Sequence, residues 1–406
     1  MIPIIAWRNI WRSRTRTFVV IGSVVLGIWA LIFLLGFTQG QVNNYVGNVI
    51  ENETSHIQFH HNEFKEDLDP RFYIARDEEL VLQLNRDPAV RAACSRILVN
   101  GMLSSSKAAQ GILAKGIDAG QEAVVTGLNN KLIDGNYLEP AERSNPIMIS
   151  ERMAEKLQVK LRSKIVMTFQ NIHGEITTAA FRVSGIYKTR NRQLDELIVY
   201  VDQTDLQRLT ELPDGASHEI AAVLHEFGQT DHLTGLWKEK YPDLLVESYK
   251  EIAPDLELFN SQIKVNIMIM TAIFMLALIF GIINTMLMAV LERLKELGML
   301  MAIGMNKLKV FFMIMLETIF ISLLGAPIGM GLGHVTIKYL HFRGINLSQW
   351  SRALEEFGMD DIIRPVMDPS VYGIITLAVI LTALLAAIYP SLKAIRLKPV
   401  EALRKI

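Results

Sequence analysis

The charged run Glu292-Arg293-Leu294-Lys295-Glu296 interrupts one of the most apolar parts of the sequence. Apolar residues precede it from Gly281 and follow it from Leu297 to Gly304, and a further long apolar run begins at Val310. A charged amphipathic helix between two membrane-length segments cannot cross a bilayer. We therefore expect a helix that lies at the membrane surface, where it can contact a soluble partner.

Two interpretations of these charges remain open. Glu292 and Lys295 have the spacing of an exposed i,i+3 pair, so the charges could belong to a solvated helix face. Apolar side chains on the same helix, among them Leu297 and Met299, need a partner of their own. This second feature favours docking.

A single carboxylate, Glu317, lies about eight residues, or about 12 Å, into the next apolar run. Acids inside membrane spans are candidates for function, and one hypothesis is proton coupling. No second ionisable residue falls at matching depth in the other spans to form a relay. The sequence therefore favours a structural acid that faces the helix bundle, hydrogen-bonded or paired near the cytoplasmic side.

Other kinds of chemistry find little support. His56, His60 and His61 are close in sequence, but no acid or cysteine is spaced to complete a metal site with them. The single cysteine, Cys94, is expected to be a buried structural thiol. No G-x-x-x-x-G-K-[ST] phosphate loop and no nucleophile–base arrangement occurs, so we expect no catalytic residue and no resident cofactor. The net charge of -1 argues against a nucleic-acid partner.

The elements that must position these residues are membrane helices. Half of the 406 residues are hydrophobic, and apolar residues gather in four long blocks. The first, residues 17–38, carries no charge and spans about 33 Å as a helix, enough to cross the hydrocarbon core. A signal peptide is the alternative, but the run is too long for one and no cleavage site follows closely. Before it, Trp7, Trp11 and four arginines predict a short amphipathic helix at the interface.

Lysine and arginine indicate the orientation. The N-terminal arginines, the loop with Arg293 and Lys307, and the C-terminal tail must share one side of a chain with four spans. All three are basic, as expected of a cytoplasmic side. The block of residues 39–262 and the loop of residues 338–369 then face the exterior.

The large outer block has the composition of a soluble protein. Strand and helix patterns at its two ends resemble each other, and strand patterns dominate its middle. We therefore predict an α-helical membrane protein with four transmembrane helices and a large extracytoplasmic α+β domain, a mixed α/β base with an inserted β-rich lobe.

Two further sets of residues are candidates for packing or binding. Gly325, Gly329 and Gly333 repeat every four residues, which creates a surface where another helix can approach closely. Phe33, Phe37, Met268 and Met275 of the first two spans could face a substrate, with ordinary lipid-facing or packing roles as the alternative.

The predicted organisation follows the chain in this order: an N-terminal helix (1–16), the first span and stalk (17–50), the first part of the base (51–118), the inserted lobe (119–216), the second part of the base (217–258), the second stalk and span (259–291), the surface helix (292–308), the third span (309–337), the second outer loop (338–369), the fourth span (370–392) and a basic tail (393–406).

The order and spacing of several short motifs resemble a known family. These motifs are Asn284-Thr285-Met286, Leu291-Glu292-Arg293, Glu296-Leu297-Gly298, Ala302-Ile303-Gly304, Glu317, the glycines from 325 to 333, and the stretch 394–403. The whole chain is similar to the permease subunits of the MacB/LolC/LolE/FtsX superfamily of ABC transporters, the type VII or mechanotransmission group. The size of the outer domain fits the LolC/LolE-like and MacB-like permeases better than FtsX, whose corresponding domain is smaller.

The resemblance implies a function and partners. The segment after the second span would be a coupling helix that docks on a separate ATPase, with Glu292, Arg293, Glu296, Leu297 and Gly298 at the contact. ATP and magnesium would be bound by that ATPase, which would be present in two copies beside a second permease or a paralogue.

Location and cargo follow from the same resemblance. The protein would lie in the bacterial inner membrane with both termini cytoplasmic. The loop Gly344–Ser348 resembles the second extracytoplasmic loop of LolC/LolE-like permeases, which favours lipoprotein release. A lipoprotein, a periplasmic carrier or an outer-membrane duct would then be a further partner. MacB-like export through a tripartite system and FtsX-like signalling without transport are the alternatives.

Overall fold

The computed structural model describes residues 2–12, 14–138, 145–189, 191–356 and 358–396. The chain forms two compact units. Unit 1 comprises residues 1–42, 260–347 and 362–406, and unit 2 comprises residues 43–259 and 348–361. Residues 397–406, most of the predicted basic tail and the end of the 394–403 motif, lie outside the described residues.

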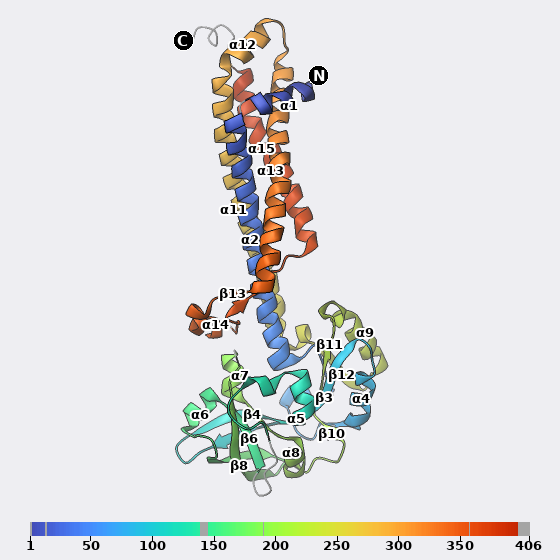
Figure 1. Cartoon of the computed structure of the whole chain (residues 1–406). Coiled ribbons are helices and arrows are strands. Elements are labelled where there is room, and N and C mark those ends of the chain that lie inside the picture. The colour runs from blue at the N-terminus through green and yellow to red at the C-terminus, as the bar shows by residue number, and fades with distance from the viewer. Residues whose placement is uncertain (1, 13, 139–144, 190, 357, 397–406) are drawn as a thin grey trace. The chain divides into compact units, whose positions relative to one another are not determined.

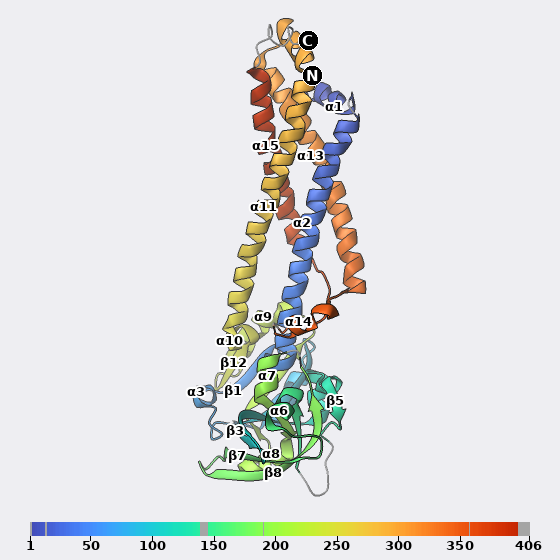
Figure 2. The ribbon, with the colours of Figure 1, turned by 90° about the vertical axis from the view of Figure 1, so that its left-hand side faces the viewer.

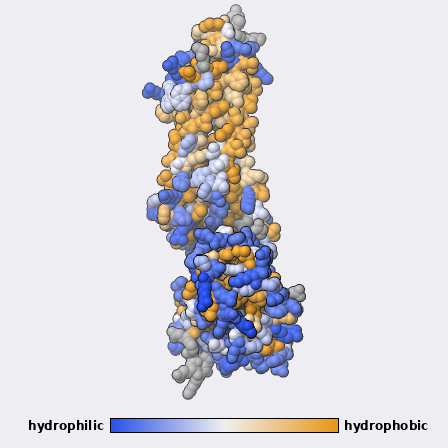
Figure 3. Space-filling model, turned by 90° about the vertical axis from the view of Figure 1, so that its right-hand side faces the viewer, coloured by the Kyte–Doolittle hydropathy of each residue, from blue (hydrophilic) through white to orange (hydrophobic). Residues whose placement is uncertain are grey.

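Unit 1 is a helical bundle (Figures 1 and 2). A short helix, α1 (Ile2–Arg12), precedes the long helix α2 (Arg14–Val49). The other helices are α11 (Pro254–Glu292), α12 (Leu294–Ala302), α13 (Lys307–Arg343) and α15 (Pro369–Ile395). Among the described residues, four of these helices are long and apolar enough to cross a membrane, and apolar side chains dominate the bundle surface in Figure 3. This confirms the predicted class of fold.

The helices differ from the predicted segments mainly at their ends. Asn306 caps α13 by accepting a hydrogen bond from the Leu308 amide at 3.1 Å, and α13 then continues to Arg343. Because a helix continues past the hydrocarbon core, hydropathy underestimates its length. The predicted surface helix of residues 292–308 is shorter in the structure, since Gly304 adopts a φ of +101° that ends the helical turn.

The glycines of α13 face α2. A Cβ at Gly325 would lie 2.9 Å from Val24 Cγ1, and one at Gly333 would lie 2.7 Å from Ile32 Cγ2. At Gly329 the nearest atom would be the backbone carbonyl oxygen of Val25, also at 2.9 Å. The predicted surface for close helix approach is therefore occupied by α2 of the same chain.

Unit 2 is built on a ten-stranded sheet. One end has the order β12 (Leu244–Ser248), β1 (Ile57–His61), β11 (Glu219–Leu224) and β3 (Val90–Ser104). The sheet continues through β4 (Ala109–Ile117), β9 (Ile198–Asp202), β6 (Asn145–Ser150), β8 (Ile176–Tyr187) and β5 (Leu132–Gly135). β7 (Lys164–Gln170) pairs with both β8 and β3, so six strands close into a ring.

Helices cover this sheet. They include α4 (Asp77–Asn85), α5 (Ala119–Val125), α6 (Glu151–Leu157), α7 (Arg192–Leu197), α8 (Gln203–Thr210) and α9 (Thr230–Lys240). The smaller elements are β2 (Ile74–Ala75), β10 (Ala216–Ser217), α3 (Phe64–Asp67), α10 (Tyr249–Ile252) and α14 (Ser351–Glu356). Ser150 caps α6 by accepting from the Met153 amide at 3.0 Å, at the position where the sequence predicts a helix start.

The sheet does not divide at the predicted boundary between residues 118 and 119. β3 pairs with β11 along its first half and with β7 along its last residues, so one strand belongs to both parts. Strand patterns reveal where strands lie but not which partners they take, which is why the two predicted subdomains share a continuous sheet here.

The second outer loop joins unit 2 through side chains at the end of α2. Asn44 Nδ2 donates to Asp360 Oδ2 at 3.1 Å, and the Asp360 amide donates back to Asn44 Oδ1 at 2.7 Å. One turn later Asn48 donates to the Gly358 carbonyl at 3.0 Å. This network explains why residues 348–361 pack with the large block of chain.

A buried ionic network lies in the middle of the sheet. Arg96 donates to both carboxylate oxygens of Glu122 at 2.8 Å and to Glu219 Oε1 at 2.6 Å. Burial raises the pKa of Glu122, but the charge and hydrogen bonds of Arg96, together with the charge of Lys115 and a hydrogen bond from Cys94, hold that pKa below its usual value. The network therefore ties α5 to β3 and β11 through paired charges.

Two buried imidazoles lie beside this network. His218 Nδ1 accepts from the Leu98 amide at 3.1 Å, so its Nε2–H is the donor to the Pro70 carbonyl at 3.1 Å. This geometry requires a neutral ring, and burial lowers the pKa of His218 to about 4. His60 bonds to the His218 carbonyl and to Gln58, so both rings are engaged by protein groups.

We predict that Gly329→Ala destabilises the bundle whereas Gly331→Ala does not. A Cβ at Gly331 finds nothing within 4 Å, which makes it a matched control on the same helix. Overpacking at Gly329 should cost roughly 1–3 kcal/mol, because the backbone of α2 has to move. Thermal unfolding of the purified chain in detergent measures the difference, and equal midpoints for both variants would contradict the packing.

Acidification should destabilise unit 2. The unfolded chain protonates His218 near pH 6.5 and the folded protein near pH 4, so stability is lost as the pH falls through this window. At about 1.4 kcal/mol per pKa unit, this residue accounts for on the order of 3 kcal/mol. Hydrogen-exchange protection of β3 and β11, corrected for intrinsic rates, reports the loss.

Two variants separate this titration from general acid sensitivity. His218→Gln should be less stable at pH 7 and should show a shallower loss between pH 6.5 and 4. His232→Gln, on the exposed face of α9, should behave as wild type. An unchanged pH slope in His218→Gln would show that this imidazole is not responsible.

Candidate coupling site

The charged run of the sequence lies where α11 gives way to α12. Arg293 has φ −97° and ψ 17°, outside the helical range, and separates the two helices. Leu297 and Gly298 of α12 are buried, whereas Lys295 and Met299 are exposed. The break therefore produces a short amphipathic helix with one face against the bundle.

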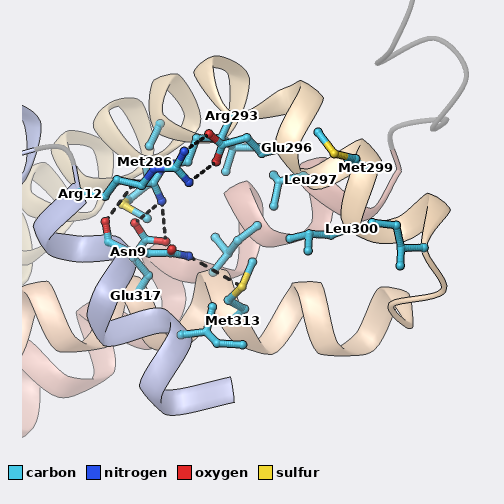
Figure 4. Close-up of a pocket in the computed structure, with 15 residues that line it drawn as sticks. Asn9, Arg12, Met286, Arg293, Glu296, Leu297, Met299, Leu300, Met313 and Glu317 are labelled. Atoms are coloured by element: carbon cyan, nitrogen blue, oxygen red, sulfur yellow. Dashed lines mark hydrogen bonds and ion pairs between the residues drawn. The ribbon is translucent and has the colours of Figure 1, made fainter. Parts of the chain in front are cut away.

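Arg293 connects three helices (Figure 4). Its Nη1 donates to Glu317 Oε1 at 3.1 Å, and its Nη2 donates to the Asn9 carbonyl of α1 at 2.9 Å. The side chain of Arg293 is 14% exposed and that of Glu317 is 6% exposed. Because removing one partner of a buried pair typically costs about 3–5 kcal/mol, this pair fixes the junction firmly.

The pair changes how two predicted site residues are understood. Arg293 was expected at a docking surface, and its guanidinium instead points into the bundle. Glu317 was expected to be a paired structural acid or a proton carrier, and the structure gives it an arginine partner 24 positions earlier. Depth along the spans did not reveal this partner, because Arg293 belongs to the junction rather than to a span.

The N-terminal helix is a part of the site that the sequence did not reveal. Arg12 Nη2 lies 2.7 Å from Glu296 Oε1, with the two side chains 64% and 43% exposed. Asn9 Nδ2 donates to Met313 Sδ at 3.8 Å. The partners of Asn9 and Arg12 lie more than 280 positions away, so no local pattern of the sequence indicated these contacts.

Three further contacts hold α1 in place. Ala6 and Ile10 are fully buried against the bundle. The Thr17 hydroxyl donates to the Ile10 carbonyl at 2.5 Å, which fixes the turn between α1 and α2. Trp7 packs edge-to-face on Phe320 of α13, with ring centroids 6.0 Å apart.

A partly open cavity of about 240 Å³ lies among α1, α11, α12 and α13. Its polar side chains come from α1, the Arg293 junction, α12 and α13, whereas those of α11 are apolar. The lining residues are Ile5, Asn9, Arg12, Met286, Ala289, Val290, Arg293, Glu296, Leu297, Met299, Leu300, Ile303, Met313, Ile314 and Glu317. Of the predicted coupling residues, Arg293, Glu296 and Leu297 therefore line the cavity, while Glu292 is exposed at the end of α11 and Gly298 is buried in α12.

The remaining predicted residues lie elsewhere. Phe33 and Phe37 are half-buried on α2 and form a stack with Trp29, whose indole donates to Thr336 at 3.0 Å. On α11, Met268 is exposed and Met275 is buried. They do not join the cavity, and their role as a substrate-facing surface stays a prediction.

The chemistry of the site is ionic contact and packing. Within the part of the chain that the structure describes, no group of three or more His, Cys, Asp or Glu side chains could hold a metal ion. The arrangement can hold a short helix at a fixed angle and present its outer face.

Comparisons with known proteins place the chain in a family. A family model described as "MacB-like periplasmic core domain" matches residues 17–231, more than half of the chain. A second, described as "FtsX-like permease C-terminal", matches residues 268–399. Together they cover most of unit 2 and the part of the site that α11, α12 and α13 contribute, whereas α1 lies before the first match.

Individual relatives are distant. The lipoprotein-releasing system transmembrane protein LolC of Neisseria meningitidis serogroup B is 22% identical, across 96% of this chain and 94% of the relative. The pyoverdine export ATP-binding/permease protein PvdT of Pseudomonas entomophila is 23% identical across 98% of this chain. The chain spans only 58% of the length of PvdT.

The periplasmic region of MacB from Actinobacillus actinomycetemcomitans aligns with 52% of this chain and 97% of its own, at 16% identity and a TM-score of 0.37. A score this low adds nothing to the assignment, which rests on the family models. The resemblance inferred from the sequence is confirmed: the chain belongs to the MacB/LolC/FtsX family of ABC-transporter permeases.

Proposed function

We propose that this permease transmits ATP-driven motion from a separate ATPase to its large outer domain. The observation that carries the proposal is the two-faced geometry of α12. Its inner side is tied to the bundle through the Arg293–Glu317 pair, and its outer side exposes Lys295 and Met299. A helix held in this way can pass a push from a soluble partner into α13.

The outer face of α12 has the character of a protein-binding surface. Ile303, at its end, is 80% exposed and Met299 is 51% exposed. Exposed apolar side chains rimmed by charges mark an interaction site. Glu292 and Lys295 supply such charges, so we assign the docking contact to these four residues.

The ATPase is proposed to act in trans. The sequence contains no phosphate loop, and ATP and magnesium would bind the partner. Two ATPase copies would serve two permease chains, or this chain and a paralogue. The protein would lie in the bacterial inner membrane with both termini in the cytoplasm, as the distribution of lysine and arginine favours.

The cargo proposed first is a lipoprotein bound for the outer membrane. This choice follows the extent of similarity to LolC, which covers nearly the whole of that relative. A second candidate is export of a periplasmic substrate through a tripartite system, which the MacB-like outer domain favours. A carrier protein would be the partner in the first case and an outer-membrane duct in the second.

A reversed or introduced charge at the proposed docking residues should weaken ATPase binding. Glu292→Lys and Ile303→Asp are expected to lower co-purification of the ATPase roughly tenfold or more, as residues at the centre of an interface do. Glu239→Lys, an exposed acid on α9, is the matched control and should bind normally. Wild-type co-purification and ATPase stimulation in both Glu292→Lys and Ile303→Asp would contradict the assignment.

The two cargo candidates differ in what accumulates on a stalled complex. With a partner ATPase that binds but cannot hydrolyse ATP, lipoproteins should co-purify if the chain serves lipoprotein release. Recovery of an outer-membrane duct without lipoproteins would favour tripartite export instead.

A further inference from the structure

We propose that the cavity among α1, α11, α12 and α13 binds the head-group end of an anionic phospholipid. This goes beyond the coupling role, and the binding step does not require an ATPase. The bilayer itself is the source of the ligand. Three features of the cavity favour this ligand: the level at which it lies, the distribution of its lining and the exchangeability of two of its polar contacts.

The cavity lies at the level of lipid head groups. Ile5, Asn9 and Arg12 line it from α1, whose outer side exposes Trp7 and Trp11, each by 43%. Tryptophan and arginine side chains gather at the boundary between lipid and water. The described helix α1 contains arginines and no acid, so this level of the protein attracts anionic lipids.

The lining combines charged and apolar side chains, as an amphiphile requires. In Figure 4, Arg12, Arg293 and Glu296 gather toward one side, and Met286 lies beside them. Val290 of α11 and Ile314 of α13 also line the cavity. A phosphate at the arginine end would therefore leave its acyl chain beside thioether and aliphatic side chains of the two long helices.

The polar contacts at that end are exchangeable. The Arg12–Glu296 pair is largely exposed, and exposed pairs contribute little to stability. The Asn9 amide donates to the sulfur of Met313, which is a weak acceptor. A phosphate oxygen is a better acceptor than sulfur for the Asn9 amide, because a hydrogen bond to a charged group is stronger. For Arg12 it is an anion of the same kind as the Glu296 carboxylate and competes with it for the guanidinium.

Binding of a phosphate would break one of the two ion pairs that hold α12 in place. A phosphate on Arg12 releases Glu296, whereas the buried Arg293–Glu317 pair stays closed. The lipid would thus loosen the outer tie between α1 and α12 and leave the inner one intact. Lipid composition would regulate how firmly the coupling helix is held.

Native mass spectrometry of the full chain tests the proposal. The protein is released from bilayers with equal amounts of phosphatidylglycerol and phosphatidylcholine of identical chains, and retained lipids are counted. We expect preferential retention of phosphatidylglycerol. Arg12→Gln should reduce this preference roughly tenfold, the factor that a hydrogen bond to a charged group provides. Glu296→Gln should strengthen it, since the competing carboxylate is gone.

Matched variants separate this site from general electrostatic attraction. Arg14→Gln removes an exposed arginine that does not line the cavity, and Glu292→Gln removes an exposed acid that does not line it. Both should leave retention unchanged, while a gain in Glu296→Gln cannot result from misfolding. Equal retention of the two lipids, or equal effects of Arg12→Gln and Arg14→Gln, would overturn the proposal. So would an unchanged preference in Glu296→Gln.

Discussion

A guanidinium and a carboxylate form an ion pair inside an otherwise apolar helical bundle. The arrangement of α1, α11, α12 and α13 at the end of the bundle that we propose faces the cytoplasm depends on this pair. Taking either charge out of water is costly, and the cost is offset only while the two remain paired. Arg293 meets Glu317 at 3.1 Å and adds a bond to the α1 backbone. Because Arg293 is also the residue at which α11 stops, the pair fixes where the short helix α12 begins and how it lies.

The site thus has two ties of different strength. The inner pair is buried and constant, whereas the outer pair, Arg12–Glu296, is exposed and open to competition from solvent or lipid. A coupling element needs both properties, since it must pass on force and also be adjustable. Unit 2 contains buried ion pairs of the same kind, in which Arg96 of β3 joins Glu122 of α5 and Glu219 of β11.

Much of this could be predicted from the sequence, because the signals are local. Apolar runs predicted the four spans, the charge at 292–296 predicted a surface helix, and Ser150 predicted a helix start. What could not be predicted was pairing. Arg293 was expected at the ATPase contact and not in a pair with Glu317, α1 was not expected to touch α12, and β3 was not expected to serve two parts of one sheet. Each of these contacts joins residues that are far apart in the chain. Hydropathy and spacing are local patterns and do not indicate which distant residues meet.

The most direct test measures whether the buried pair fixes the coupling helix. Spin labels at Lys295 on α12 and Leu332 on α13, both exposed, report the distance between these helices, and the only native cysteine, Cys94, is buried. We expect a narrow distance distribution in the wild type, a broadened or shifted one in Glu317→Gln, and a wild-type distribution in the control Glu292→Gln. An unchanged distribution in Glu317→Gln would contradict the claim that this pair holds α12 in place.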